Sequence, residues 1–319
     1  MNPDVLANTA SGASNRHAKG RLLGAYVDVS QLLQLRHYLA TPSGNVSSSV
    51  VGTQSGVKLS KIKGRGIDFS EVRTYQPGDD IRSIDWRVTA RKNKPHTKIF
   101  REERERPTLL FVDQSQAMFF ASSQRLKSVV AAETAARVAW HTLAAGDRVG
   151  GVVVGNRPTA LFRPLRSSRV LARFLNEIAA QNRALNRIAE PTADNAVSDG
   201  INQLRRLSKN RYRIILISDF SRAEGVWMDP IKRLGERNQV HLVHISDPLE
   251  ASLPPAAQYA VTDGARRLQF HSGRKRLRDQ YETQFMARCE ALQKLSHHPA
   301  IRYTALSTHT GSLDLQRLG

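Results

Sequence analysis

Two aspartates that end apolar runs are the residues of this chain best suited to chemistry. Asp113 follows the run Thr108 to Val112, and Asp219 follows Ser218 after the run Ile214 to Ile217. Each run is short and continuous, as expected for a central strand buried on both faces of a parallel sheet. Open α/β sheets bind ligands beyond the carboxyl ends of their strands, so both carboxylates are expected at one edge. With neighbouring hydroxyls, they have the oxygen chemistry that a hard cation such as Mg²⁺ requires.

Composition narrows the class of protein. The chain has 319 residues, 40% of them hydrophobic, and a formal net charge of +20, which favours an anionic partner such as nucleic acid, an acidic protein face or lipid headgroups. Its single cysteine, Cys289, excludes a disulfide framework and a cysteine metal cluster. No apolar run approaches the roughly 20 residues of a membrane span, and residues 1–20 lack a signal-peptide core. We therefore expect a soluble, cytoplasmic protein.

Three segments differ in pattern. Residues 1–56 predict a mobile N-terminus, a short helix capped by Ser30 and a flexible linker. Residues 57–106 are rich in charges and lack a helical period, which indicates short strands and turns. Residues 107–319 alternate strands with helices, the pattern of a doubly wound, mostly parallel α/β sheet. Within this segment, Asp229-Pro230 has the residues of a helix start.

Two motifs resemble known families. Asp113-Gln114-Ser115-Gln116-Ala117 resembles the Asp-x-Ser-x-Ser motif of von Willebrand factor A domains. The stretch from Gly64 to Trp86, continued by Ala90-Arg91, resembles the signature of the domain-of-unknown-function 58 family, in which a von Willebrand A-like domain follows. The resemblance covers roughly residues 57–310. It implies an adaptor or chaperone-like role, often linked with MoxR-type AAA+ ATPases.

The first resemblance also implies a metal-ion-dependent adhesion site. Asp113 and Ser115 match its first acidic and hydroxyl positions, Asp219 its second acidic position, and Thr192 its loop threonine, with Ser198 as a weaker candidate. Ala117 departs from the pattern because alanine has no ligand atom. The site is therefore either a weak Mg²⁺ site or a degenerate one that keeps only the fold. In the second case, Asp113 caps backbone N–H groups and Asp219 anchors a loop.

The second motif supplies a candidate docking surface. The turn at Tyr75 to Asp80 has proline and glycine in the positions that a tight turn favours. The aspartates and arginines of the motif indicate ion pairs that hold an irregular segment in place. Alternatively, they belong to a partner-docking surface anchored by Trp86. A third possibility is an anion site around Lys61, Lys63 and Arg65. The candidate partner-binding residues are Arg65, Arg73, Tyr75, Asp79, Asp80, Arg82, Asp85, Trp86 and Arg91.

Three functions follow from these patterns. The leading hypothesis is a non-enzymatic protein-interaction module whose protein partner is an AAA+ ATPase or its client, and the charge of the chain favours an acidic surface on that partner. Nucleic-acid binding suits the charge, but aromatic residues make up only 6% of the chain and no recognised module is present. A metal-dependent hydrolase would use Asp113 and Asp219, yet the sequence places no histidine or lysine as their general base.

Overall fold

The computed structural model describes residues 20–39, 67–102, 106–186, 193–221, 224–262, 267–309 and 313. Among the predicted site residues, Thr192 and Arg65 lie outside these ranges, as do Lys61 and Lys63. The described residues form two compact units. The sheet unit comprises residues 20–39 and those from 106 onward, and the signature unit comprises residues 67–102.

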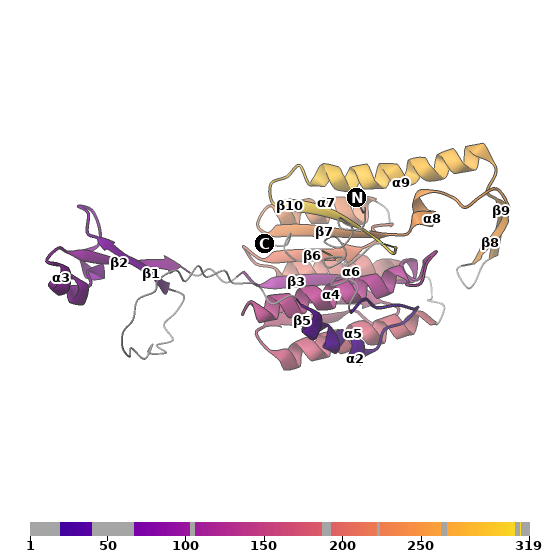
Figure 1. Cartoon of the computed structure of the whole chain (residues 1–319). Helices are drawn as coiled ribbons and strands as arrows, with labels where there is room; N and C mark the ends of the chain where they lie inside the picture. The colour runs from indigo at the N-terminus through magenta and orange to yellow at the C-terminus, as the bar shows by residue number, and fades with distance from the viewer. Residues whose placement is uncertain are drawn as a thin grey trace, which may run out of the picture. The chain divides into compact units, whose positions relative to one another are not determined.

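A six-stranded sheet forms the centre of the sheet unit (Figure 1). Its strand order is β10-β7-β6-β3-β4-β5, and all neighbours are parallel except β4 and β5. The mostly parallel sheet that the sequence predicts is therefore present. The strands are β3 (Thr108–Gln114), β4 (Val149–Gly155), β5 (Ala160–Leu165), β6 (Arg213–Ser218), β7 (Gln239–Ser246) and β10 (Ile301–Ser307).

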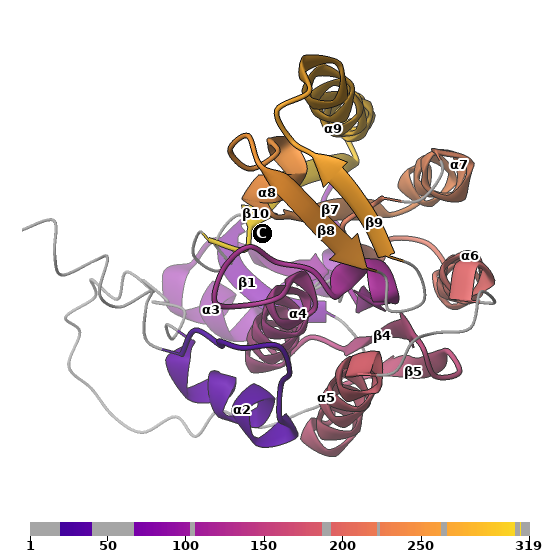
Figure 2. The same ribbon diagram turned by 90° about the vertical axis from the view of Figure 1, so that its right-hand side faces the viewer.

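Helices cover both faces of this sheet (Figure 2). One face packs on α2 (Val29–Gln34), α4 (Lys127–Ala144) and α5 (Ser168–Arg183). The other packs on α6 (Ala193–Leu207), α7 (Glu224–Gly235) and α9 (Lys275–Leu295). Alternate residues of β6 serve the two cores, Ile215 on the α4 side and Leu216 on the α6 side. A strand buried on both faces must be apolar throughout, which explains the continuous runs in the sequence.

Short elements complete the sheet unit. They are η1 (Leu35–Tyr38), η3 (Gln116–Met118), η4 (Ala184–Asn186), α8 (Pro248–Ala251) and the antiparallel hairpin of β8 (Gln258–Thr262) and β9 (Arg267–His271). The first described helix is capped by Asp28 rather than Ser30. Among the described residues, no helix combines the length and apolar composition needed to cross a membrane.

Two elements of the sheet unit differ from the sequence prediction. Helix α7 begins at Glu224 and contains Pro230, so Asp229-Pro230 does not start it. Buried Trp227 and Ile231 anchor this helix on the sheet, and tertiary packing outweighs the local cost of proline. Strand β5 was not predicted because it lies at the sheet edge, where Pro164 is tolerated and alternate residues are exposed.

The signature unit pairs two antiparallel strands, β1 (Ile67–Thr74) and β2 (His96–Glu102), with η2 (Ile81–Ser83) and α3 (Trp86–Lys92) between them. The predicted turn is present, since Asp79 N donates to Gln76 O at 3.0 Å and Gly78 has a φ of +107°. Helix α3 was not predicted. Asp85 caps this helix by accepting hydrogen bonds from the N–H groups of Arg87 and Val88. An aspartate is a typical cap residue, but the helix is too short to show a helical period in the sequence.

Buried charges join the N-terminal segment to α4. Glu133 is 1% exposed and accepts hydrogen bonds from Arg125 Nη1 at 3.0 Å, Arg137 Nε at 2.8 Å and Leu22 N at 3.0 Å. Arg137 Nη2 donates in turn to Gly20 O at 2.9 Å. Because one carboxylate serves two cations and a backbone N–H, its loss leaves several buried polar groups without their partner.

We therefore expect Glu133→Ala to lower the free energy of unfolding by about 3–5 kcal/mol, the cost of breaking a buried ion pair. Urea unfolding at neutral pH measures the change. The matched control is Glu290→Ala on an exposed position of α9, for which about 0.5 kcal/mol or less is expected. Equal destabilisation by both variants would contradict a structural role for the buried cluster.

Candidate functional site

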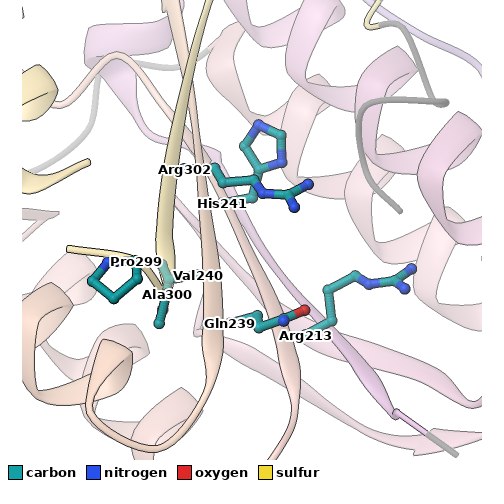
Figure 3. A pocket seen from close by; sticks show the side chains of 7 residues that line it. All are labelled: Arg213, Gln239, Val240, His241, Pro299, Ala300 and Arg302. Carbon is teal, nitrogen blue, oxygen red and sulfur yellow. The ribbon is translucent and has the colours of Figure 1, made fainter. Parts of the chain in front are cut away.

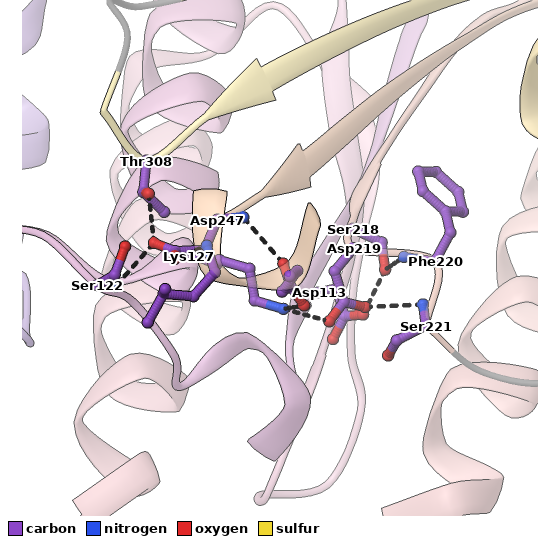
Figure 4. A network of polar contacts seen from close by, with 11 residues as sticks. Asp113, Ser122, Lys127, Ser218, Asp219, Phe220, Ser221, Asp247 and Thr308 are labelled. Carbon is purple, nitrogen blue, oxygen red and sulfur yellow. Dashed lines mark hydrogen bonds and ion pairs between the residues drawn. The ribbon is translucent and has the colours of Figure 1, made fainter. Parts of the chain in front are cut away.

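Asp113 and Asp219 lie at the same edge of the sheet, at the carboxyl ends of the adjacent strands β3 and β6 (Figure 4). Each is 2% exposed. Ser218 links them, because its Oγ donates to Asp113 Oδ2 at 2.6 Å while Asp219 is the next residue in the chain. We call this region the carboxyl edge.

A buried lysine at the carboxyl edge contacts one of the two aspartates directly. Lys127 Nζ lies 2.7 Å from Asp219 Oδ2 and 2.7 Å from Glu250 Oε1, and its side chain is 2% exposed. Lys127 is the first residue of α4, and Glu250 belongs to α8, so the contacts join three elements of the unit. A lysine at a helix N-terminus is electrostatically unfavourable, and the two carboxylates offset that cost.

Burial and neighbouring charges together set the protonation states of Lys127, Asp219 and Asp113. Burial favours the neutral forms, yet attraction to Asp219 and Glu250 outweighs it and raises the pKa of Lys127. For Asp219, burial is likewise outweighed by the charge and hydrogen bond of Lys127, so its pKa is lowered. Burial raises the pKa of Asp113, and repulsion from Asp219 raises it further. The ammonium and the Asp219 carboxylate are therefore both charged at neutral pH.

The oxygens of the two aspartates are engaged within the protein. Asp113 Oδ1 accepts from Ser115 N at 2.9 Å, and Asp219 Oδ1 accepts from Ser221 N at 3.0 Å. Their Oδ2 atoms accept from Ser218 and Lys127 respectively. The contacts from Ser115 N and Ser221 N are local backbone contacts of the kind expected for a degenerate site.

The described residues of the carboxyl edge, which do not include Thr192, do not fit a divalent cation. Ser115 offers a hydroxyl oxygen as a possible ligand, but Ala117 offers none. An ammonium group already lies against Asp219, and a second cation at hydrogen-bonding distance would be repelled by it. The described residues contain no group of three or more His, Cys, Asp or Glu side chains that could hold a metal ion. Ser198, the weaker threonine substitute, is half-buried on α6.

Three polar residues of the carboxyl edge, Lys127, Asp247 and Glu250, were not predicted from the sequence. Lys127 and Glu250 carry no local signal beyond a lysine at a helix start. Asp247 did carry one, because it follows the apolar strand β7 just as Asp113 and Asp219 follow theirs. Asp247 Oδ2 accepts from Thr308 Oγ1 at 2.6 Å and from Ser122 N at 2.8 Å, so it joins the ends of β7 and β10 to the loop before α4.

The acidic residues of the signature unit make internal contacts. Asp79 pairs with Arg73 at 2.7 Å and accepts from Gln76 N, and its backbone contacts lower its pKa. Asp80 accepts from Arg82 N at the start of η2. These aspartates, together with Asp85 as the cap of α3, hydrogen-bond the backbone of their own unit.

Two large apolar side chains of the same unit are instead exposed. Trp86 is 68% exposed and Ile81 is 66% exposed, and each is followed in the sequence by an arginine. Arg82, Arg87 and Arg91 are exposed, whereas Tyr75 is half-buried. We define the Trp86 surface as Ile81, Arg82, Trp86 and Arg87.

Comparison with known proteins gives the family. A model of the family described as "Protein of unknown function DUF58" matches residues 71–291, so the chain belongs to that family and the resemblance seen in the signature is confirmed. The uncharacterized proteins Rv1480 of Mycobacterium tuberculosis and Mb1516 of Mycobacterium bovis are each 32% identical over 227 residues, 70% of this chain and 69% of theirs.

Two solved structures are more distantly similar. The conserved hypothetical protein BatB from Bacteroides thetaiotaomicron is 16% identical, with a TM-score of 0.40 over 63% of this chain and 89% of that one. An aerotolerance-related membrane protein from Bacteroides fragilis is 17% identical, with a TM-score of 0.38 over 63% and 91%. At these TM-scores neither similarity establishes a common fold.

Removal of the Lys127 charge tests its role at the carboxyl edge. We expect Lys127→Met to lower the free energy of unfolding by about 3–5 kcal/mol, because it leaves Asp219 and Glu250 buried without their cation. The double variant Lys127→Met/Asp219→Asn should regain part of this loss, because one of the uncompensated charges is then gone. Urea unfolding at neutral pH measures all three proteins.

Lys294→Met is the matched control, since Lys294 is exposed on α9 and its loss should cost about 0.5 kcal/mol or less. A Lys127→Met protein as stable as this control, or a double variant less stable than the single one, would contradict the assignment.

Proposed function

We propose that this DUF58 family member is a non-enzymatic protein-interaction module with a von Willebrand A-like sheet unit, which acts as an adaptor for an AAA+ ATPase of the MoxR type. The position of Asp113-Gln114-Ser115 at the carboxyl end of a central strand supports the proposed fold. The link to MoxR-type ATPases comes from the family resemblance of the signature. The observation that carries the docking role is the exposure of Trp86 in a segment whose acidic residues are used internally.

In this proposal, partner binding does not depend on a metal ion at the carboxyl edge. A metal-ion-dependent adhesion site binds its partner through an open coordination position on the cation. Here Lys127 supplies the positive charge, and Asp219 and Glu250 already neutralise it within the fold. The adhesion site is therefore degenerate, and its residues stabilise the edge.

The Trp86 surface is the proposed contact with the ATPase. Tryptophan and arginine are enriched among the residues that dominate binding energy at interfaces. Trp86 and Ile81 supply apolar area, and Arg82 and Arg87 supply positive charge beside it. This combination suits a partner with an apolar pocket bordered by acidic residues.

Two features argue against hydrolysis. Asp113 and Asp219 are each 2% exposed, so a substrate could not reach them without rearrangement of the edge. Lys127 lies beside Asp219, but its pKa is raised and it is protonated at neutral pH. A protonated lysine cannot act as a general base.

The docking role is tested with the full chain and a purified MoxR-type AAA+ ATPase. We expect Trp86→Ala to weaken binding by about 2 kcal/mol or more, the cost of removing an aromatic anchor. Biolayer interferometry with the immobilised chain measures the dissociation constant.

Leu268→Ala is the matched control, because Leu268 on β9 is 64% exposed and lies in the other unit. The Leu268→Ala variant should bind the ATPase with the same affinity as the unaltered chain. If wild-type chain fails to bind the ATPase, or if Trp86→Ala binds as tightly as Leu268→Ala, the proposed docking surface is wrong.

A further inference from the structure

A pocket lies at the edge of the sheet opposite the carboxyl edge, at the amino-terminal ends of three parallel strands (Figure 3). The strand register pairs Arg213 of β6 with Gln239 of β7, and His241 of β7 with Arg302 of β10, so these four residues project from one face. The pocket has a volume of about 40 Å³. A buried water needs about 10–15 Å³ by this measure, so there is room for about three waters or one tetrahedral oxyanion.

Positive charge is concentrated around this pocket. Arg213 and Arg302 line it, and Arg106 reaches it by donating from Nη1 to Gln239 Oε1 at 3.3 Å. Burial lowers the pKa of Arg213, the carboxylate of Asp147 opposes this, and the charges of Arg106 and Arg302 lower it further. Arg213 is therefore close enough to both Arg106 and Arg302 to be repelled by their charges.

Arg213 also has an unused hydrogen-bond donor. Its Nε is buried and makes no hydrogen bond among the described residues. A buried donor without a partner is costly, and a guanidinium is suited to two parallel hydrogen bonds with an oxyanion. His241 lines the pocket but adds no positive charge at neutral pH, because burial, together with the charge of Arg302, lowers its pKa to about 4.

We propose that this pocket binds a single phosphate group, either free phosphate or the terminal group of a small phosphorylated molecule, through Arg213 and the neighbouring arginines. The fixed fork of a guanidinium matches phosphate oxygens, and the size of the pocket matches one such group. A bound phosphate would satisfy the buried Arg213 donor and reduce the repulsion among the cations. The site lies at the opposite edge from Lys127 and is independent of the adaptor role.

Titration of the full chain with inorganic phosphate, followed by calorimetry, tests the proposal. We expect saturable binding that weakens about tenfold or more in Arg213→Gln, because a hydrogen bond to a charged group is lost. Gln239→Glu should weaken binding similarly by placing a carboxylate beside Arg106. Because Gln239 is exposed, this second variant is expected to fold even if Arg213→Gln does not.

Arg237→Gln is the matched control for net charge, since Arg237 is exposed and lies near the same edge in the loop before β7. It should bind phosphate as the unaltered chain does. ADP distinguishes the two sources, because tighter binding than phosphate identifies a phosphorylated molecule, and equal or weaker binding identifies free phosphate. Absence of saturable phosphate binding, or equal weakening by Arg237→Gln and Arg213→Gln, would overturn the proposal.

Discussion

The ion pairs of Lys127 are the interaction on which the carboxyl edge depends. Removing an ammonium group and carboxylates from water costs several kcal/mol per ion, and only close pairing with good geometry repays that cost. The two 2.7 Å contacts of Lys127 provide it. They hold the start of α4, the end of β6 and the short helix α8 together, and so fix the positions of the residues that follow the central strands.

The same helix carries a second set of buried charges. Glu133 lies further along α4. It accepts hydrogen bonds from the side chains of Arg125 and Arg137 and from the backbone N–H of Leu22 in the N-terminal segment. Fifteen of its residues are buried, Lys127 and Glu133 among them, so α4 cannot be read as an ordinary amphipathic helix. Its polar side chains connect distant parts of the chain, whereas its apolar ones fill the core against β3 and β6.

The fold could be predicted from the sequence because its signals are local. Continuous apolar runs mark β3 and β6, and a helical period marks α5. Where packing outweighs local preference, prediction failed, as at Pro230 within α7. The position of Asp113 and Asp219 at one edge followed from strand direction alone. The position of Lys127 between Asp219 and Glu250 could not be predicted, because these two residues lie 92 and 123 positions away from Lys127 in the sequence.

Crystals of the full chain grown with Mn²⁺ test the central claim most directly, through the anomalous signal at the carboxyl edge. If Lys127 supplies the cation, the map has no manganese peak beside Asp113 and Asp219, and electron density for Nζ lies at hydrogen-bonding distance from both Asp219 and Glu250. A manganese ion bound by those aspartates, with the lysine side chain displaced toward solvent, would contradict the account.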